Sequence, residues 1–216
     1  MHPRGRLIAL EGIDGCGKST QARILAEHTG AALTREPGAT PLGQALRDHL
    51  LGAPPGAFGA RAEALLLAAD RAEHVAAVIE PALASGRWVV SDRFSGSTFA
   101  YQGYGRGLDL AALGRIVEFA ASGIEADLNV LIDTPVELAR ARLAGTRPDR
   151  FESLDEAFHR KVADGYLHLA RAHPGSWVVV AGTDPPEVVG RRVLAAVAER
   201  LGSPPDLLSE DERDDR

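Results

Sequence analysis

The sequence predicts an α/β fold in which five parallel strands form one sheet with helices on both faces. Short apolar runs alternate along the chain with longer stretches of helical periodicity, which is the pattern of successive βαβ units. A glycine-rich loop directly follows the first apolar run and opens the first helical stretch. The length of 216 residues and the 45% content of apolar residues suit one domain with a single core.

The predicted strands are short and largely apolar, because the central strands of a parallel sheet are buried on both faces. The first is RLIAL, the fourth is NVLID and the fifth is WVVVA. In chain order the strands are expected at residues 6–10, 31–35, 87–91, 129–133 and 177–181.

The predicted helices occupy the intervals between the strands. Pro41, Pro135 and Pro185 stand where helices are expected to begin, a position that tolerates proline because the missing N–H would have no helical partner there. The helices are expected at residues 18–28, 41–51, 60–85, 110–121, 135–143, 154–173 and 185–201.

Two segments interrupt this alternation. Residues 144–153, AGTRPDRFES, are polar and join two predicted helices, so we expect a mobile loop or lid there. From residue 203 prolines and then mostly acidic residues follow the last predicted helix, a composition typical of disorder. We therefore expect a single domain over residues 1–202 and a disordered acidic tail over residues 203–216.

The composition limits the partners of the protein. A net charge of −6 disfavours a protein that grips nucleic acid through a broad basic surface. No apolar run approaches the roughly 20 residues that span a bilayer. The N-terminal apolar stretch is too short for the core of a signal peptide, and Cys16 is the single cysteine. We expect a cytoplasmic protein that binds neither nucleic acid nor membranes.

Residues 12–19, GIDGCGKS, match the pattern G-x-x-x-x-G-K-[ST] between a predicted strand and a predicted helix. In this setting backbone N–H groups and the helix N-terminus bind phosphates, the lysine reaches the β- and γ-phosphates, and the serine hydroxyl can ligate Mg²⁺. A glycine-rich turn that binds nothing is the weaker alternative, because motif and context agree. The predicted nucleotide-binding residues are Gly12, Ile13, Asp14, Gly15, Cys16, Gly17, Lys18, Ser19 and Thr20.

The loop alone leaves three destinations for the γ-phosphoryl group: water, a small acceptor, or no transfer. A GTPase would carry the guanine-binding pattern N-K-x-D, which this sequence lacks. A motor ATPase would usually carry an acidic pair after an apolar strand, whereas NVLID is followed by Thr134 and VVSD by Arg93. Hydrolysis is therefore disfavoured.

Asp92 and Arg93 follow the third predicted strand, and TREPG, residues 34–38, ends the second. The carboxyl ends of parallel strands border the crevice in which such sheets bind ligands. There Arg93 can bind a phosphate through both arms of its guanidinium group, and Asp92 can help to position Mg²⁺. For the dipeptide alone a surface pair that caps a helix is the simpler interpretation, but TREPG at the same rim weakens it.

Five motifs in order make the chain similar to the bacterial thymidylate kinase family, whose members phosphorylate dTMP with ATP. They are EGIDGCGKST (11–20), TREPGATPLG (34–43), LLLAADRAEHV (65–75), DRFSGSTFAYQG (92–103) and RPDRFE (147–152). The resemblance extends from the first predicted strand to the last predicted helix. It implies the P-loop nucleoside monophosphate kinase fold with a lid, ATP with Mg²⁺ bound by Ser19 and Asp92, dTMP as the acceptor, and a homodimer.

The resemblance also implies roles around the acceptor. Arg93 would bind the phosphate of dTMP, Arg35 or Arg47 would add positive charge, and Glu36 would belong to the same wall. Arg71 would donate to a thymine carbonyl, and such a donor would face the amino group of cytosine badly. Others would line the base and sugar: Ser97, Thr98 and Gln102 at the base, Tyr101 under the sugar, and Asp14 at the 3′-hydroxyl.

Two positions depart from common family patterns. Leu67 stands where the family commonly has a phenylalanine that stacks on thymine, so the base preference is expected to be weaker or broader. Gly15 stands where some members have an arginine, and the resemblance then assigns the catalytic charge to Arg147 and Arg150 in the lid, beside Lys18 and Arg93. Arg140 or Arg142 would lie over adenine, near residues 181–183.

No general base is needed, because the acceptor is a phosphate monoester that is already ionised; catalysis would rest on positioning and cations. Two alternatives stay open. One is a kinase of another nucleoside monophosphate or of a deoxynucleoside, with Glu36 as the base in the latter case. The other is a P-loop switch that hydrolyses ATP slowly. The helix expected at residues 60–85 could supply a dimer interface or could pack within one chain.

Overall fold

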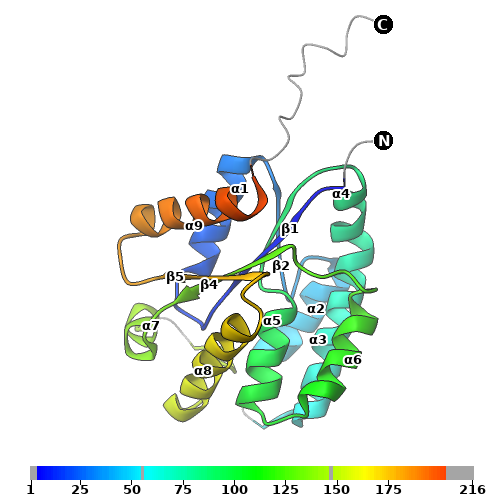
Figure 1. The fold of residues 1–216 in the computed structure, drawn as a ribbon. Coiled ribbons are helices and arrows are strands. Elements are labelled where there is room, and N and C mark those ends of the chain that lie inside the picture. Colours follow the sequence, from blue (N-terminus) through cyan, green and yellow to red (C-terminus); the bar gives the residue numbers. More distant parts are fainter. Residues whose placement is uncertain (1–3, 55, 146–147, 203–216) are drawn as a thin grey trace, which may run out of the picture.

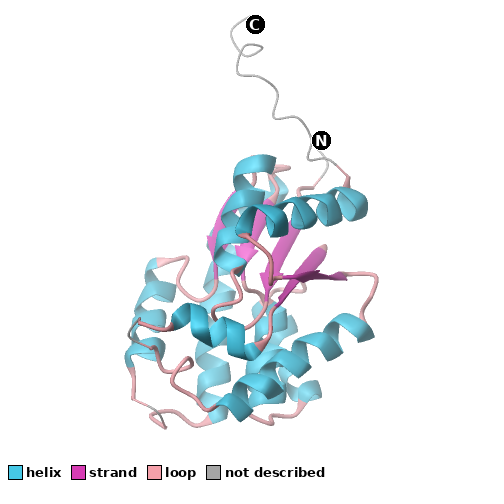
Figure 2. Ribbon diagram, turned by 90° about the vertical axis from the view of Figure 1, so that its left-hand side faces the viewer, coloured by secondary structure: helices cyan, strands magenta, loops and turns pink. Residues whose placement is uncertain are grey.

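The computed structural model describes residues 4–54, 56–145 and 148–202. Within these ranges five strands form one parallel sheet in the order β2-β3-β1-β4-β5, with helices on both faces (Figures 1 and 2). The predicted fold class is confirmed. The strands are β1 (Leu7–Glu11), β2 (Ala32–Arg35), β3 (Val89–Asp92), β4 (Leu128–Asp133) and β5 (Trp177–Ala181).

The sheet topology gathers the sequence motifs at one edge. β1 is fully buried and lies between β3 and β4. In the register of these strands Leu10 pairs with Asp92, and Asp92 pairs on its other side with Arg35. The phosphate loop, the Asp92–Arg93 pair and the TREPG segment therefore leave the sheet side by side.

The seven predicted helices are confirmed with small changes at their ends. Pro135 and Pro185 are N-caps rather than first helical residues. The helix expected from residue 154 begins at Glu156, and its N-cap Asp155 accepts a hydrogen bond from the backbone N–H of Phe158. The helices expected from sequence are α1 (Lys18–Thr29), α2 (Pro41–Gly52), α3 (Ala60–His74) with η1 (Val75–Ile79) and α4 (Glu80–Ala84), α6 (Leu110–Ala120), α7 (Val136–Leu143), α8 (Glu156–Ala172) and α9 (Pro186–Leu201).

The expected helix over residues 60–85 is one helical run with a π-helical turn, η1, inside it. Figure 1 shows α1 and α9 together on one side of the molecule and α2, α3 and α6 grouped on the other. Alternate residues of β1 enter different clusters of buried side chains: Ile8 and Leu10 join one, and Leu7 and Ala9 join another. The sheet therefore carries packed side chains on both faces, as the apolar strands predict.

One helical segment was not expected from the sequence. α5 (Ser95–Thr98) and the π-helical η2 (Phe99–Gly105) cover most of the DRFSGSTFAYQG motif, whose glycines and serines are poor helix formers. The N-terminus of α5 is held by the carboxylate of Glu11 at the end of β1, which accepts hydrogen bonds from the backbone N–H groups of Phe94 and Ser97. A Cβ at Gly96 would lie 2.7 Å from Trp177, so glycine is required where the segment packs on the sheet.

Within the described residues no helix is both long enough and apolar enough to span a bilayer. The tail for which disorder was expected, residues 203–216, lies outside the described ranges. So does Arg147, together with residue 146, in the segment expected to be a lid.

Candidate active site

The phosphate loop joins β1 to α1. Gly15 and Gly17 have φ angles of 80° and 97°, a region that glycine enters without strain. A Cβ at Gly15 would lie 2.2 Å from the carbonyl oxygen of Ala139, so a side chain at this position would require α7 to shift. Among the described residues no side chain caps the N-terminus of α1, and its first N–H groups therefore suit an anion.

Lys18 lies over this loop and is almost completely buried. Its Nζ donates to the carbonyl oxygen of Ile13 at 3.3 Å and reaches Oδ1 of Asp14 at 3.5 Å. The ammonium group is thus held within the loop, where a bound phosphate would meet it.

Ser19 and Asp92 form a hydrogen-bonded pair beside the loop, with 2.5 Å between Oγ and Oδ2. Oδ1 of Asp92 is buried without a hydrogen-bond partner in the described part of the chain. Among the described residues no group of three or more His, Cys, Asp or Glu side chains could hold a metal alone. A hydroxyl beside a carboxylate oxygen suits Mg²⁺, which keeps waters and takes substrate phosphates as its other ligands.

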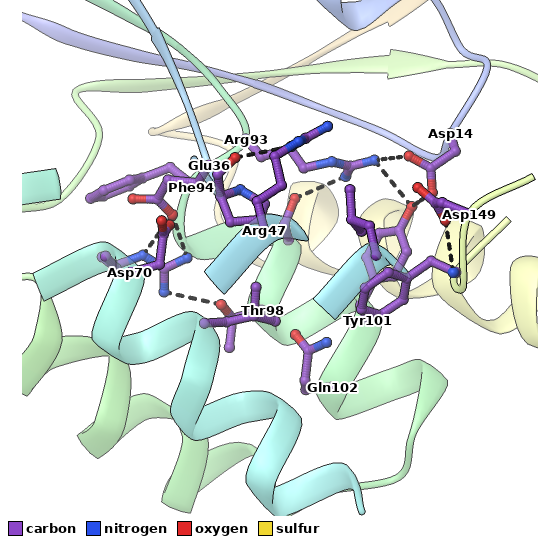
Figure 3. A pocket seen from close by; sticks show the side chains of 16 residues that line it. Asp14, Glu36, Arg47, Asp70, Arg93, Phe94, Thr98, Tyr101, Gln102 and Asp149 are labelled. Atoms are coloured by element: carbon purple, nitrogen blue, oxygen red, sulfur yellow. Dashed lines mark hydrogen bonds and ion pairs between the residues drawn. The ribbon is translucent and has the colours of Figure 1, made fainter. Parts of the chain in front are cut away.

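Two adjoining cavities open at this edge of the sheet. The larger lies over the phosphate loop, and its lining includes Lys18, Ser19, Thr20, Asp92 and Arg142. The smaller lies between α3 and the α5–η2 segment (Figure 3) and is lined in part by Leu67, Arg71, Thr98, Tyr101 and Gln102. Five residues line both cavities: Asp14, Glu36, Arg47, Arg93 and Asp149.

Arg93 stands on the shared wall with a positive φ of 74°, unusual for a residue with a side chain. Its Nη1 donates at 3.0 Å to the carbonyl oxygen of Gly12, to Oγ of Ser97 and to the hydroxyl of Tyr166. Its Nη2 donates to Asp14 at 2.5 Å and to the Tyr101 hydroxyl at 3.2 Å (Figure 3). These contacts fix the guanidinium group between the two cavities.

Asp14 holds its charge in this wall. The Tyr101 hydroxyl donates to its Oδ2 at 2.7 Å while Arg93 binds Oδ1. Burial alone would raise the pKa of Asp14, but the charges of Arg93 and Lys18 outweigh it and hold the pKa well below its usual range. The loop therefore presents a carboxylate toward both cavities.

Arg71 and Glu36 form a buried ion pair on the opposite wall. Nε and Nη2 of Arg71 donate to Oε2 of Glu36 at 3.0 and 2.8 Å, and Nη1 donates to Oγ1 of Thr98 at 3.0 Å. The other oxygen of Glu36 lies 3.0 Å from Nδ1 of His74. Burial would raise the pKa of Glu36, but Arg71 and His74 outweigh it and lower the pKa. Both oxygens are occupied, which disfavours Glu36 as a base for a nucleoside hydroxyl.

Residues 10–193 match the protein-family model described as thymidylate kinase. The chain belongs to the thymidylate kinase family. It is 47% identical over 209 residues to a thymidylate kinase of Synechococcus sp. (strain RCC307), covering 92% of this chain and 98% of that protein. It is 51% identical over 178 residues to one from Chromobacterium violaceum, covering 79% and 83% of the two chains.

A solved structure gives the same result. The thymidylate kinase from Ehrlichia chaffeensis superposes with a TM-score of 0.77 at 29% identity and covers 90% of this chain and 100% of its own. The family resemblance read from the five motifs is therefore confirmed, and with it the P-loop nucleoside monophosphate kinase fold.

In this thymidylate kinase site Glu11 has a structural role that the sequence analysis did not assign to it. It is completely buried, and besides the two backbone N–H groups that it caps it accepts from Oγ of Ser97 at 2.6 Å and from the Tyr166 hydroxyl at 3.1 Å. Burial raises its pKa, against the effect of these donors and of Arg93. An acidic residue directly after a buried strand was the only sequence signal.

The predicted substrate residues differ in where they lie. Arg47 lines both cavities, whereas Arg35 lines the larger one and donates to Gln44. Burial lowers the pKa of Arg47, and the neighbouring charge of Arg35 adds to this effect. Leu67 lines the smaller cavity and contributes an aliphatic side chain to it.

Asp70 also lines the smaller cavity and was not predicted as a site residue. Its Oδ1 accepts from the backbone N–H of Gly38 at 2.9 Å, and its Oδ2 is buried with no partner among the described residues. Burial and the nearby charge of Glu36 raise the pKa of Asp70 to about 6. The sequence signal was its place beside Arg71, but its burial depends on the fold.

Arg142, predicted beside adenine, and Arg150, predicted as a catalytic arginine of the lid, have contrasting positions. Arg142 lines the larger cavity and donates to the carbonyl oxygens of Cys16 and Gly182 at 3.3 and 2.9 Å. Arg150 is buried, donates to Oε2 of Glu63 at 2.7 Å and to the carbonyl oxygen of Leu50 at 2.9 Å, and is not among the residues that line either cavity.

Proposed function

We propose how the residues of this site divide the reaction of the family between them. As a member of the thymidylate kinase family, the chain transfers the γ-phosphoryl group of ATP to dTMP, giving dTDP and ADP. This assignment of residues to the two substrates is supported by one observation: two cavities adjoin and share Asp14, Arg47 and Arg93. One cavity would hold ATP and the other dTMP, and their phosphates would meet at the shared wall.

On the ATP side the phosphate loop and Lys18 would bind the β- and γ-phosphates, and Arg142 would lie beside the adenine. Ser19 and the oxygen of Asp92 that has no partner among the described residues would hold Mg²⁺. The ion would neutralise charge on the phosphates and orient them for transfer.

On the acceptor side Arg93 would bind the phosphate of dTMP, with Arg47 supplying further charge. The dTMP phosphate is itself the nucleophile and is ionised near neutral pH, so no side chain has to remove a proton. The protein would contribute alignment and positive charge around the transferred group.

The smaller cavity would bind the thymine base and the sugar of dTMP and select for them. Arg71 would donate to a keto oxygen of thymine, Tyr101 would lie under the sugar, and Asp14 would accept from the 3′-hydroxyl. The buried pairing of Arg71 with Glu36 supports this role, because it fixes the direction of the guanidinium group.

Residues 144–153 would act as the lid, with Arg147 and Arg150 as its cations. Arg150 is paired with Glu63 and outside both cavities in the present arrangement. A direct contact between Arg150 and the transferred group would therefore require the segment to move.

Two copies of the chain would pair through α3 and α6. Leu65 of α3 and Leu110 and Phe119 of α6 are exposed, Phe119 by 89%, and α3 and α6 pack beside each other. Exposed apolar side chains on two neighbouring helices are suited to an interface. We expect this homodimer in the cytoplasm, and light scattering would measure its mass.

A coupled assay of ADP formation tests the acceptor. With ATP and Mg²⁺ present, dTMP should raise ADP formation more than dUMP, dCMP, dGMP or thymidine. The proposal is wrong if thymidine outperforms dTMP or if no acceptor stimulates turnover.

A further inference from the structure

We propose that Glu63 is a positioning residue that fixes the orientation of the Gln102 carboxamide, so that Gln102 accepts a hydrogen bond from N3–H of the thymine base. The proposal rests on the smaller cavity being the dTMP site and on Gln102 lying beside the base, which the family resemblance already implies; the role of Glu63 goes beyond it. It concerns a residue on α3 that the reaction itself does not need.

Glu63 lies in the first turn of α3 with no exposed surface. Its Oε1 accepts from Nε2 of Gln102 at 2.9 Å and from Nε of Arg106 at 3.2 Å. Its Oε2 accepts from Arg106 at 3.0 Å and from Arg150 at 2.7 Å. Two guanidinium groups and one amide thus converge on a single buried carboxylate.

This arrangement determines whether the NH₂ group or the oxygen of the Gln102 amide faces Glu63. A carboxylate paired with two arginines can only accept, so the NH₂ end of the amide must face Glu63. The reversed amide would place its oxygen against the carboxylate oxygens and would leave the NH₂ group without this acceptor. Glu63 therefore holds the amide in one of its two orientations.

The oxygen end of the same amide is unsatisfied. Oε1 of Gln102 is buried and has no hydrogen-bond partner among the described residues, although Gln102 is only 1% exposed. Gln102 lines the smaller cavity, and its amide oxygen in Figure 3 points toward the other labelled side chains of that cavity. A buried acceptor without a partner is costly, and a ligand N–H would satisfy it.

The edge of the pyrimidine supplies such a donor. In thymine and uracil N3 carries a hydrogen between two keto oxygens, whereas in cytosine N3 is an acceptor beside an amino group. The fixed oxygen of Gln102 would accept from thymine and would face the lone pair of cytosine N3. Arg71 would test the neighbouring exocyclic group, so two adjacent atoms of the base would be read from α3 and η2.

The variant Glu63→Gln tests this positioning. A carboxamide at position 63 can donate or accept, so the Gln102 amide becomes free to reverse and to offer its NH₂ group to cytosine. We expect the ratio of kcat/KM for dTMP to that for dCMP to fall about tenfold, the value of roughly one hydrogen bond. The ratio for dTMP to dUMP should stay unchanged, because both bases carry N3–H.

These ratios separate positioning from other effects of the variant. Any loss of charge near the transferred phosphoryl group, for instance through Arg150, lowers turnover with both acceptors and cancels in the ratio. The matched control Arg106→Gln breaks an ion pair to Glu63 but keeps the carboxylate and its bond to Gln102, so its dTMP to dCMP ratio should equal that of the wild type.

A second background shows whether Glu63 acts through Gln102. In Gln102→Leu the substitution E63Q should leave the dTMP to dCMP ratio unchanged. If E63Q alone does not fold, the charge-balanced E63Q/R106Q variant carries the same prediction relative to R106Q. An unchanged ratio in E63Q, an equal loss in R106Q, or a further loss in the Gln102→Leu background would overturn the inference. A wild-type enzyme that does not use dTMP would instead refute the proposed function.

Discussion

The substitution Asp70→Asn should stabilise the fold, and the gain should depend on pH. Burial and the charge of Glu36 raise the pKa of Asp70 from 3.8 to about 6. At about 1.36 kcal/mol for each tenfold change in proton affinity, this rise corresponds to about 3 kcal/mol. The native state binds the proton more tightly than the unfolded state, so stability falls as the pH rises from about 4 to about 6.

Asparagine removes this penalty and keeps the useful contact. Its carbonyl oxygen can still accept from the N–H of Gly38, and its NH₂ group would replace the carboxylate oxygen that has no partner among the described residues. At pH 8 the free energy of unfolding should rise by up to about 3 kcal/mol, which corresponds to a Tm increase of about 6 to 12 °C for a chain of this length. At pH 5 the gain should be clearly smaller.

Urea unfolding without ligand at pH 5, 6, 7 and 8 measures the effect, with Asp48→Asn as the control. Asp48 is exposed on α2, so its substitution should change stability little at every pH. The reasoning is refuted if Asp70→Asn lowers stability at pH 8, or if its gain is the same at pH 5 and pH 8.

Three further substitutions test other parts of the site. Leu67→Phe should lower the KM for dTMP by a few fold, since aromatic stacking contributes about 0.5 to 1.5 kcal/mol; an unchanged or higher KM would contradict the place assigned to the base. Ser19→Ala should raise the Mg²⁺ concentration for half-maximal activity without changing the Tm of the free enzyme by more than about 2 °C, as expected for a surface change of within about 0.5 kcal/mol. Glu11→Gln should lower the free energy of unfolding by about 1 to 3 kcal/mol, because it disturbs a completely buried acceptor of four hydrogen bonds. It should also lower kcat, because Arg93 shares the partners Ser97 and Tyr166 with Glu11. Wild-type stability would contradict the first expectation, and wild-type kcat would contradict the second.

The sequence predicted the strands and most helices because each has a local signal. Buried parallel strands are continuous apolar runs, and proline or aspartate marks the starts of α2, α7, α8 and α9. The α5–η2 segment lacked such a signal, since its N-terminal cap is supplied by Glu11, more than 80 residues earlier in the chain. Propensity alone assigned its glycines and serines to a loop.

Part of the candidate site could likewise be predicted from the sequence, and part of it could not. The topology of parallel strands was enough to predict that the phosphate loop, the Asp92–Arg93 pair and TREPG meet at one edge. The partners of the charged side chains were not predictable, because pairs such as Arg71–Glu36 and Arg150–Glu63 join residues 35 and 87 positions apart. Arg150 in particular carries the same motif signal whether it faces a phosphate or a buried carboxylate.

The hydrogen bonds around Arg93 have a consequence for how tightly a substrate can bind. A free arginine side chain loses about 1.5 to 2 kcal/mol of rotamer entropy when it is ordered. Five hydrogen bonds already order Arg93 before any phosphate arrives. An acceptor phosphate therefore meets a preorganised guanidinium group, and the entropy of fixing that side chain is lost when the chain folds instead of each time dTMP binds.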